Sequence, residues 1–251
     1  MLNYSEFGAP DAPIVLIVHG LYGSGRNWGV IAKRLSDQFR VITVDQRNHG
    51  FSPWNAEHSY PAMADDLAQV IAHVGAPVHV VGHSMGGKAA MALAVQAPDL
   101  VQRLIIADIA PVAYTHDQMQ FISAMRAVDL QQITRRSDAE VQLAAQGVEP
   151  ALQSFFTQSL DVAEKKWRLN LDVLAAEMDK IIGFPQLTGK FDGPTLFLSG
   201  ANSDFVQPEY RPTIKSLFPA ARFAKLPGAG HWLHAEKPRE FEAALRAFLT
   251  A

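Results

Sequence analysis

The sequence VGHSMGG at residues 81–87 places Ser84 between two glycines at the end of an apolar run. The run at residues 78–81 is rich in β-branched side chains and predicts a strand, whereas the alanine-rich segment at residues 88–96 predicts a helix that ends before Pro98. Ser84 therefore occupies a sharp turn from a strand into a helix. We expect glycine on both sides of it, because a Cβ at either position would collide with the neighbouring strand or helix.

Similar apolar runs recur along the chain and are separated by helical patterns. Within each run the apolar residues are nearly continuous, which is typical of strands buried on both faces of a parallel sheet. Strands that alternate with helices predict a doubly wound α/β sheet. Besides residues 78–81, the predicted strands are residues 14–18, 41–44, 104–107, 195–198 and, as a weaker edge candidate, 222–226; the other predicted helices are residues 60–74 and 238–249.

The region at residues 113–185 breaks this alternation, since it carries helical signals and no convincing strand. A capping-box pattern at residues 137–140 predicts a helix start, and a run with helical periodicity extends over residues 167–182. We expect residues 1–112 and 186–251 to form the core domain and residues 113–185 to form a helical cap over a ligand site. A plain packing layer is the alternative.

The composition narrows the classes of protein that this chain can belong to. The 251 residues include no cysteine, which excludes disulfides and thiolate metal sites. With 22 basic and 25 acidic residues the net charge is −3, and no basic cluster supports nucleic-acid binding. The first apolar run is too short for a signal-peptide core or a membrane span, so we expect a cytoplasmic protein. The oligomeric state has no signal in the sequence.

A serine on such a turn acts as a nucleophile when a histidine and a carboxylate activate it. In this kind of fold the acid and then the histidine follow the serine along the chain. His231 follows the last predicted strand in a loop flanked by Gly228 and Gly230, so it is the expected base. His234, nearer the following helix, is the alternative and suits a supporting role.

Two carboxylates lie where the acid is expected. Asp108 follows the predicted strand at residues 104–107, and Asp204 follows the one at residues 195–198. Both positions are loops at strand ends, from which a carboxylate reaches the second nitrogen of His231. The residues alone leave the choice between them open.

Two backbone N–H groups are expected to bind an oxyanion beside Ser84. One belongs to Met85, which follows the serine, and the other to Leu21, in the glycine-rich loop after the first predicted strand. A phosphate-binding loop is the competing interpretation of residues 19–25, but the segment lacks the Lys-Ser/Thr ending and the G-x-G-x-x-G spacing.

Four segments together resemble the α/β-hydrolase superfamily over nearly the whole chain, and most closely the small esterases of the YbfF type, which are similar to the abhydrolase-domain 11 proteins. The segments are HGLYGS at residues 19–24, DQRNHGFS at 45–52, GHSMGG at 82–87 and GHWLHAEKP at 230–238. The resemblance implies Asp108 as the acid and associates Ser203 with the histidine. We expect the segment at residues 45–52 to be structural, with Asn48 and His49 at the edge of the site.

These features predict an enzyme of the carboxylesterase or thioesterase type, which cleaves small-molecule esters or thioesters, acyl-CoA among them, through an acyl-enzyme. The chemistry requires no metal and no organic cofactor. Alternatives are a C–C bond hydrolase, lyase or perhydrolase with the same residues, a ligand receptor on a hydrolase scaffold, and a module that binds a partner through the cap. The expected substrate-contacting residues are Tyr22, His83, Met119, Phe121, Met125, Phe155, Phe156, Trp167 and Trp232.

Overall fold

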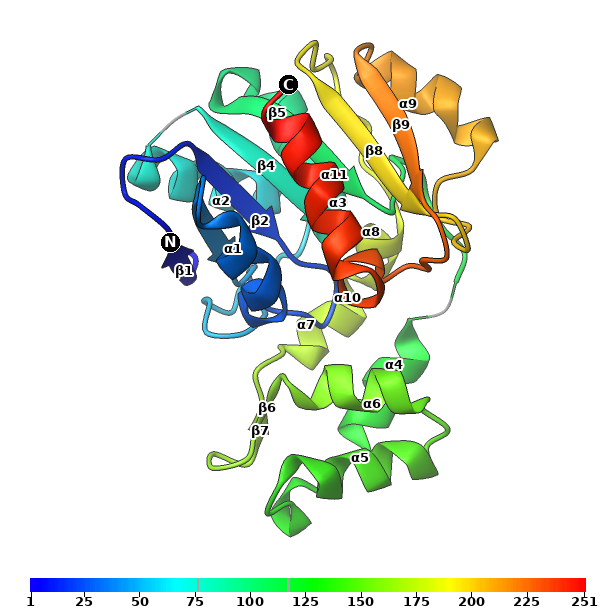
Figure 1. Cartoon of the computed structure of the whole chain (residues 1–251). Helices are drawn as coiled ribbons and strands as arrows, with labels where there is room; N and C mark the ends of the chain where they lie inside the picture. The colour runs from blue at the N-terminus through cyan, green and yellow to red at the C-terminus, as the bar shows by residue number, and fades with distance from the viewer. Residues whose placement is uncertain (76, 117) are drawn as a thin grey trace.

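The computed structural model describes residues 1–75, 77–116 and 118–251. Within these residues the chain builds a seven-stranded sheet in the order β1-β3-β2-β4-β5-β8-β9 (Figure 1). Within this seven-stranded sheet only β1 is antiparallel to its neighbour, and the other strand pairs are parallel. The strands are β1 (Tyr4–Phe7), β2 (Ile14–Val18), β3 (Arg40–Val44), β4 (Val78–His83), β5 (Val101–Ala107), β8 (Thr195–Gly200) and β9 (Ala221–Leu226).

The sheet confirms the predicted α/β fold, and each predicted strand lies within an observed one. All six residues of β4 and all six of β8 are buried, as the continuous apolar runs indicate. The segment at residues 222–226 lies in the edge strand β9, and two of its five residues are half-buried or buried. The sequence did not reveal β1, because this edge strand has only four residues and none of them is fully buried.

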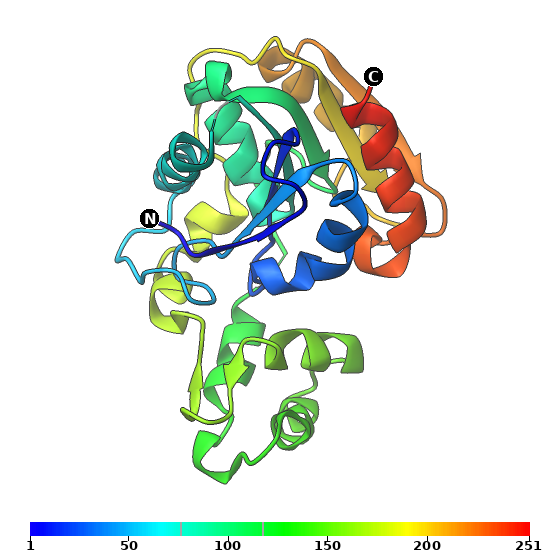
Figure 2. The ribbon, with the colours of Figure 1, turned by 60° about the vertical axis from the view of Figure 1, so that its left-hand side comes forward.

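Helices cover both faces of the sheet (Figure 2). Side chains of α1 (Gly29–Leu35) and α11 (Pro238–Leu249) share one apolar cluster with β2 and β8, whereas α2 (Tyr60–Val74) and α3 (Met85–Gln96) belong to the cluster on the other face. No helix in the described part of the chain is long and apolar enough to cross a membrane. The remaining helices of the core are α9 (Arg211–Leu217), α10 (Leu233–Glu236) and the 3-10 helices η1 (Gly25–Trp28), η2 (Pro98–Leu100) and η4 (Pro208–Tyr210).

Between β5 and β8 the chain forms a mainly helical unit that lies next to the carboxyl ends of the parallel strands (Figure 1). Its division from the core at residues 113 and 185 stays a prediction. The elements are α4 (Met119–Arg126), η3 (Leu130–Gln132), α5 (Arg136–Ala145), α6 (Pro150–Thr157), β6 (Leu160–Asp161), β7 (Lys166–Trp167), α7 (Leu171–Ala176) and α8 (Met178–Ile182).

Three local predictions in this unit are wrong. The region does contain strands, since β6 pairs with β7 in an antiparallel hairpin. The expected helix over residues 167–182 is broken, because Asn170 caps a new helix by accepting a hydrogen bond from the N–H of Val173. The predicted capping box is displaced: the carboxylate that accepts the N–H groups of Thr134 and Arg135 before α5 is that of Asp138.

Candidate active site

Ser84 occupies the turn between β4 and α3 with φ 52° and ψ −122°, a left-handed backbone conformation that L residues rarely adopt. A Cβ on Gly82 would lie 2.4 Å from the carbonyl oxygen of Gly86, and a Cβ on Gly86 would lie 2.4 Å from the carbonyl oxygen of Val18. Only glycine fits at either position, so these residues allow the tight turn that lifts Ser84 above the strand end. The helix starts directly at Met85, three residues before the predicted start.

A continuous chain of hydrogen bonds links Ser84, His231 and Asp108. The Ser84 Oγ lies 3.1 Å from the His231 Nε2, and the His231 Nδ1 lies 2.8 Å from the Asp108 Oδ2. Because the carboxylate accepts at Nδ1, the imidazole carries its proton there and leaves the Nε2 lone pair for the serine hydroxyl. The Ser84 N–H donates to the carbonyl of Ala107 on the adjacent β5, which places the serine beside the loop that carries Asp108.

The two carboxylates that the sequence left open lie in different surroundings. Asp108 is fully buried and also accepts hydrogen bonds from the Gly200 N–H at 3.0 Å and the Ser203 Oγ at 2.5 Å. Asp204 is exposed, and its Oδ1 accepts a hydrogen bond from the Gln207 side chain. The structure therefore brings Asp108 and Ser203, and not Asp204, to the side of His231.

The loop that contains Leu21 approaches the serine closely. A Cβ on Gly20 would lie 3.2 Å from the Cβ of Ser84, so a side chain at this position would crowd the serine. Leu21 and Met85 both line the cavity above Ser84. Met85 is the first residue of α3, and the first N–H groups of a helix have no acceptor within the helix. The two residues that carry the predicted oxyanion donors thus both lie at the cavity.

A cavity of about 350 Å³ opens over Ser84 between the core and the helices of residues 113–185. Six of the nine expected substrate-contacting residues line it: Tyr22, His83, Phe121, Phe155, Phe156 and Trp232. The other three are outside its described lining. Trp167 donates its Nε1 hydrogen to the carbonyl of Met125, and both side chains are buried in the helical unit between β5 and β8, whereas Met119 is partly exposed.

Sequence reasoning missed several polar residues of the cavity wall, Lys88 foremost. Its Nζ donates to the carbonyl oxygens of Ile182 at 2.8 Å and Gly183 at 2.6 Å, and it lies 4.7 Å from the centre of the Tyr114 ring. Burial lowers the pKa of Lys88 from 10.5 to about 7. Lys88 follows Ser84 by four residues, which is one helical turn, so the two lie on the same face of α3. From this spacing the sequence could have predicted that Lys88 lies near the cavity.

The Lys88 ammonium makes the stability of the protein depend on pH. Above about pH 7 the folded protein releases the Lys88 proton, whereas the unfolded chain retains it up to about pH 10.5. Between these two pH values the unfolded chain binds more protons, so the free energy of unfolding rises with pH. We expect the unfolding free energy of wild type, relative to Lys88→Met, to rise with pH by at most about 1.4 kcal/mol per pH unit. Urea unfolding of both proteins from pH 7 to pH 10 measures it, and a difference that is independent of pH contradicts the expectation.

His83 and His234 form a buried support behind His231. The His83 Nε2 donates to the carbonyl of His231 at 2.9 Å, and the His234 ring stacks on Trp28 with 4.1 Å between ring centroids. Burial lowers the pKa of His83 and lowers that of His234 to about 3. His234, the alternative base in the sequence analysis, has no hydrogen bond to Ser84 in the described part of the chain, and its place against Trp28 suits a supporting role.

Comparison with known proteins defines the class. A family model described as the alpha/beta hydrolase fold matches residues 13–238. The chain belongs to the α/β-hydrolase family, and it is an enzyme of the ester-hydrolase type.

The similar proteins are named for ester hydrolysis. The chain is 43% identical over 253 residues to the sn-1-specific diacylglycerol lipase ABHD11 of Mus musculus, covering 96% of this chain and 82% of the relative. It is 40% identical over 243 residues to the esterase YbfF of Escherichia coli, covering 95% and 93%. A solved structure called a marine microorganism esterase superposes with a TM-score of 0.93 at 36% identity and covers 98% of both chains.

Proposed function

We propose that the chain is a serine esterase in which Ser84 is the nucleophile, His231 the general base and Asp108 the residue that orients the imidazole. The carrying observation is the unbroken hydrogen-bond chain from the Ser84 Oγ through His231 to the buried Asp108, at the wall of a cavity. The exposed position of Asp204 supports Asp108 as the acid.

The proposed reaction starts with attack of the Ser84 Oγ on the ester carbonyl while the His231 Nε2 takes the hydroxyl proton. The N–H groups of Leu21 and Met85 bind the resulting oxyanion. His231 then gives the proton to the leaving alcohol, and an acyl-enzyme remains on Ser84. A water molecule that His231 activates attacks the acyl carbonyl and releases the acid.

The carboxylate of Asp108 is held for this role from two sides. The Gly200 N–H binds one carboxylate oxygen, and the Ser203 hydroxyl binds the oxygen that His231 also contacts. Ser203 therefore fixes the direction of the carboxylate and, through it, the tilt of the imidazole. Hydrogen bonds to a carboxylate also favour its charged form, which stabilises the imidazolium that arises during attack.

The lining of the cavity supports an apolar acyl group as the part of the substrate that binds there. Phe121, Leu152, Phe155 and Phe156 come from the helices between β5 and β8, and we propose that these helices act as a cap over the acyl chain. The names of the relatives, a diacylglycerol lipase and an esterase, support oxygen esters. A thioester with the same acyl group passes through the same steps, because the leaving thiol needs no more than the proton from His231.

The test combines labelling with a substrate series. A fluorophosphonate should modify one residue, Ser84, as located by peptide mass spectrometry, and p-nitrophenyl esters from acetyl to palmitoyl should be hydrolysed with an optimum set by the cavity. Acyl-CoA of the preferred chain length, compared with the oxygen ester, measures the thioester preference. A label on another serine, or no turnover across both series, contradicts the proposal.

A further inference from the structure

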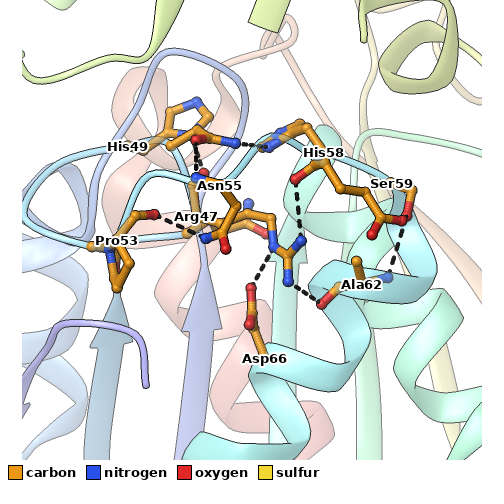
Figure 3. A network of polar contacts seen from close by, with 12 residues as sticks. Arg47, His49, Pro53, Asn55, His58, Ser59, Ala62 and Asp66 are labelled. Carbon is orange, nitrogen blue, oxygen red and sulfur yellow. Dashed lines mark hydrogen bonds and ion pairs between the residues drawn. The ribbon is translucent and has the colours of Figure 1, made fainter. Parts of the chain in front are cut away.

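The segment at residues 45–52 does not line the cavity, yet its polar groups are tied to their surroundings. The Asp45 carboxylate accepts hydrogen bonds from the N–H groups of Gly25 at 2.8 Å and Phe51 at 3.0 Å. Figure 3 shows the Arg47 guanidinium directed into the start of α2, where it binds Asp66 at 2.6 Å and the carbonyl of Ala62 at 3.0 Å. Hydrogen bonds therefore hold the segment against two parts of the core, the loop at Gly25 and the start of α2.

His49 belongs to this segment, and its hydrogen bonds define one tautomer of the imidazole. Its Nδ1 lies 2.9 Å from the carbonyl oxygen of Arg47, and since a carbonyl only accepts, the ring proton is on Nδ1. The lone pair of Nε2 then receives the N–H of Tyr22 at 3.2 Å. Burial, with smaller contributions from His19 and His58, lowers the pKa of His49 well below its ordinary value of 6.5, so the ring stays neutral.

A second buried histidine holds the peptide on the other side of Leu21. The His19 Nε2 accepts the N–H of Gln46 at 2.9 Å, so its Nδ1 carries the proton and donates to the carbonyl of Gly20 at 2.8 Å. That carbonyl belongs to the same planar trans peptide as the Leu21 N–H, and the two groups point in opposite directions. Fixing the Gly20 oxygen therefore fixes where the Leu21 N–H points.

The two peptide units that flank Leu21 are thus each held by one histidine. Tyr22 has φ 63°, a left-handed conformation that an unsupported tyrosine rarely adopts. The acceptor on His49 stabilises this turn at the Tyr22 N–H. Without it the turn can relax, which changes the direction of the Leu21 N–H, the proposed oxyanion donor.

We propose that His49 is a positioning residue which, through the Nε2 lone pair that binds the Tyr22 N–H, keeps the Leu21 N–H aimed at the oxyanion formed on Ser84. The inference rests on the proposed serine esterase function. An oxyanion donor acts through preorganised geometry. A small change in the direction of its N–H therefore reduces the stabilisation of the transition state, while the binding of the ester is little affected. His49 does this without contact with the substrate, because it lies behind the loop and not in the cavity wall.

Two substitutions separate the two hydrogen bonds of the ring. His49→Gln places an amide oxygen near the Nε2 position and keeps an acceptor for Tyr22, but removes the donor to Arg47. His49→Asn places an amide nitrogen near the Nδ1 position and keeps the donor to Arg47, but removes the acceptor. We expect His49→Asn to lower kcat about 10- to 100-fold with KM within about twofold of wild type, and His49→Gln to recover most of kcat.

A trifluoromethyl ketone gives a second measurement, since its adduct with Ser84 carries an oxyanion. Its affinity should fall in His49→Asn by the same factor as kcat/KM and remain near that of wild type in His49→Gln. His73→Asn, at an exposed position on α2, is the matched control and should leave kcat unchanged. Thermal unfolding of all variants separates a local effect from general destabilisation.

The possible outcomes distinguish the inference from the function on which it rests. Equal kcat losses in both His49 variants, or full kcat in His49→Asn, overturn the positioning role while Ser84-dependent turnover of wild type upholds the esterase. Turnover by wild type that survives Ser84→Ala overturns both. If His49→Asn does not fold, His49→Leu, which has neither an acceptor for Tyr22 nor a donor for Arg47, replaces it: kcat and ketone affinity retained in His49→Gln and lowered tenfold or more in His49→Leu support the role, and equal values in these two variants overturn it.

Discussion

Ser84→Ala is expected to lower kcat on p-nitrophenyl esters by about a million-fold, to the level left by oxyanion binding and substrate positioning. The variant keeps the cavity, His231 and both proposed oxyanion donors, but has no oxygen that can form the acyl-enzyme. The expected loss is therefore in kcat, with KM for the ester nearly unchanged. Active-site titration with a fluorophosphonate should label wild type stoichiometrically and leave the variant unlabelled.

The structure provides a control for the folding of this variant. Alanine has the same Cβ as serine, so the backbone at φ 52° is no more strained in Ser84→Ala than in wild type, and Tm should change by no more than a few degrees. Ser216→Ala, at an exposed position on α9, is the matched substitution and should retain full activity. Turnover that survives in Ser84→Ala contradicts the assignment of the nucleophile.

The fold could be predicted because its signals are local. Strands such as β4 and β8 are buried on both faces, so their apolar runs are continuous, and the glycines around Ser84 mark the strand-to-helix turn. The interruption after Trp167 was hidden, because the apolar periodicity of residues 167–182 continues through a hairpin strand and two short helices. Periodicity reports which side chains are apolar, whereas the break depends on the cap that Asn170 provides.

Candidate site residues were predictable to the extent that their position in the chain fixes their position in space. Residues at the ends of parallel strands meet at one edge of the sheet, which is how Ser84, Asp108 and His231 could be singled out. The apolar residues of the helical unit between β5 and β8 have no such constraint. Phe155 lines the cavity and Met125 is buried inside this unit, and a single sequence does not tell these two apolar environments apart.

Asp108→Asn is the second large effect, with an expected fall in kcat of about ten-thousand-fold. The amide nitrogen of the variant donates to His231 Nδ1 and so favours the tautomer with its proton on Nε2, which has no lone pair for the Ser84 hydroxyl. The site should tolerate the substitution structurally, because an asparagine oxygen still accepts the Gly200 N–H and asparagine adopts the observed φ of 53° more readily than most residues.

Asp204→Asn is the matched comparison for Asp108→Asn, since it makes the same chemical change at the other strand-end carboxylate. This side chain is exposed, and its Oδ1 accepts a hydrogen bond from the Gln207 amide. An asparagine oxygen can accept the same hydrogen bond, so kcat should remain within about twofold of wild type. Steady-state kinetics of the two variants on one ester decide between them. A large loss in Asp204→Asn with activity retained in Asp108→Asn would mean that the loop after β8 rearranges to bring Asp204 to His231, because no other described carboxylate contacts the imidazole.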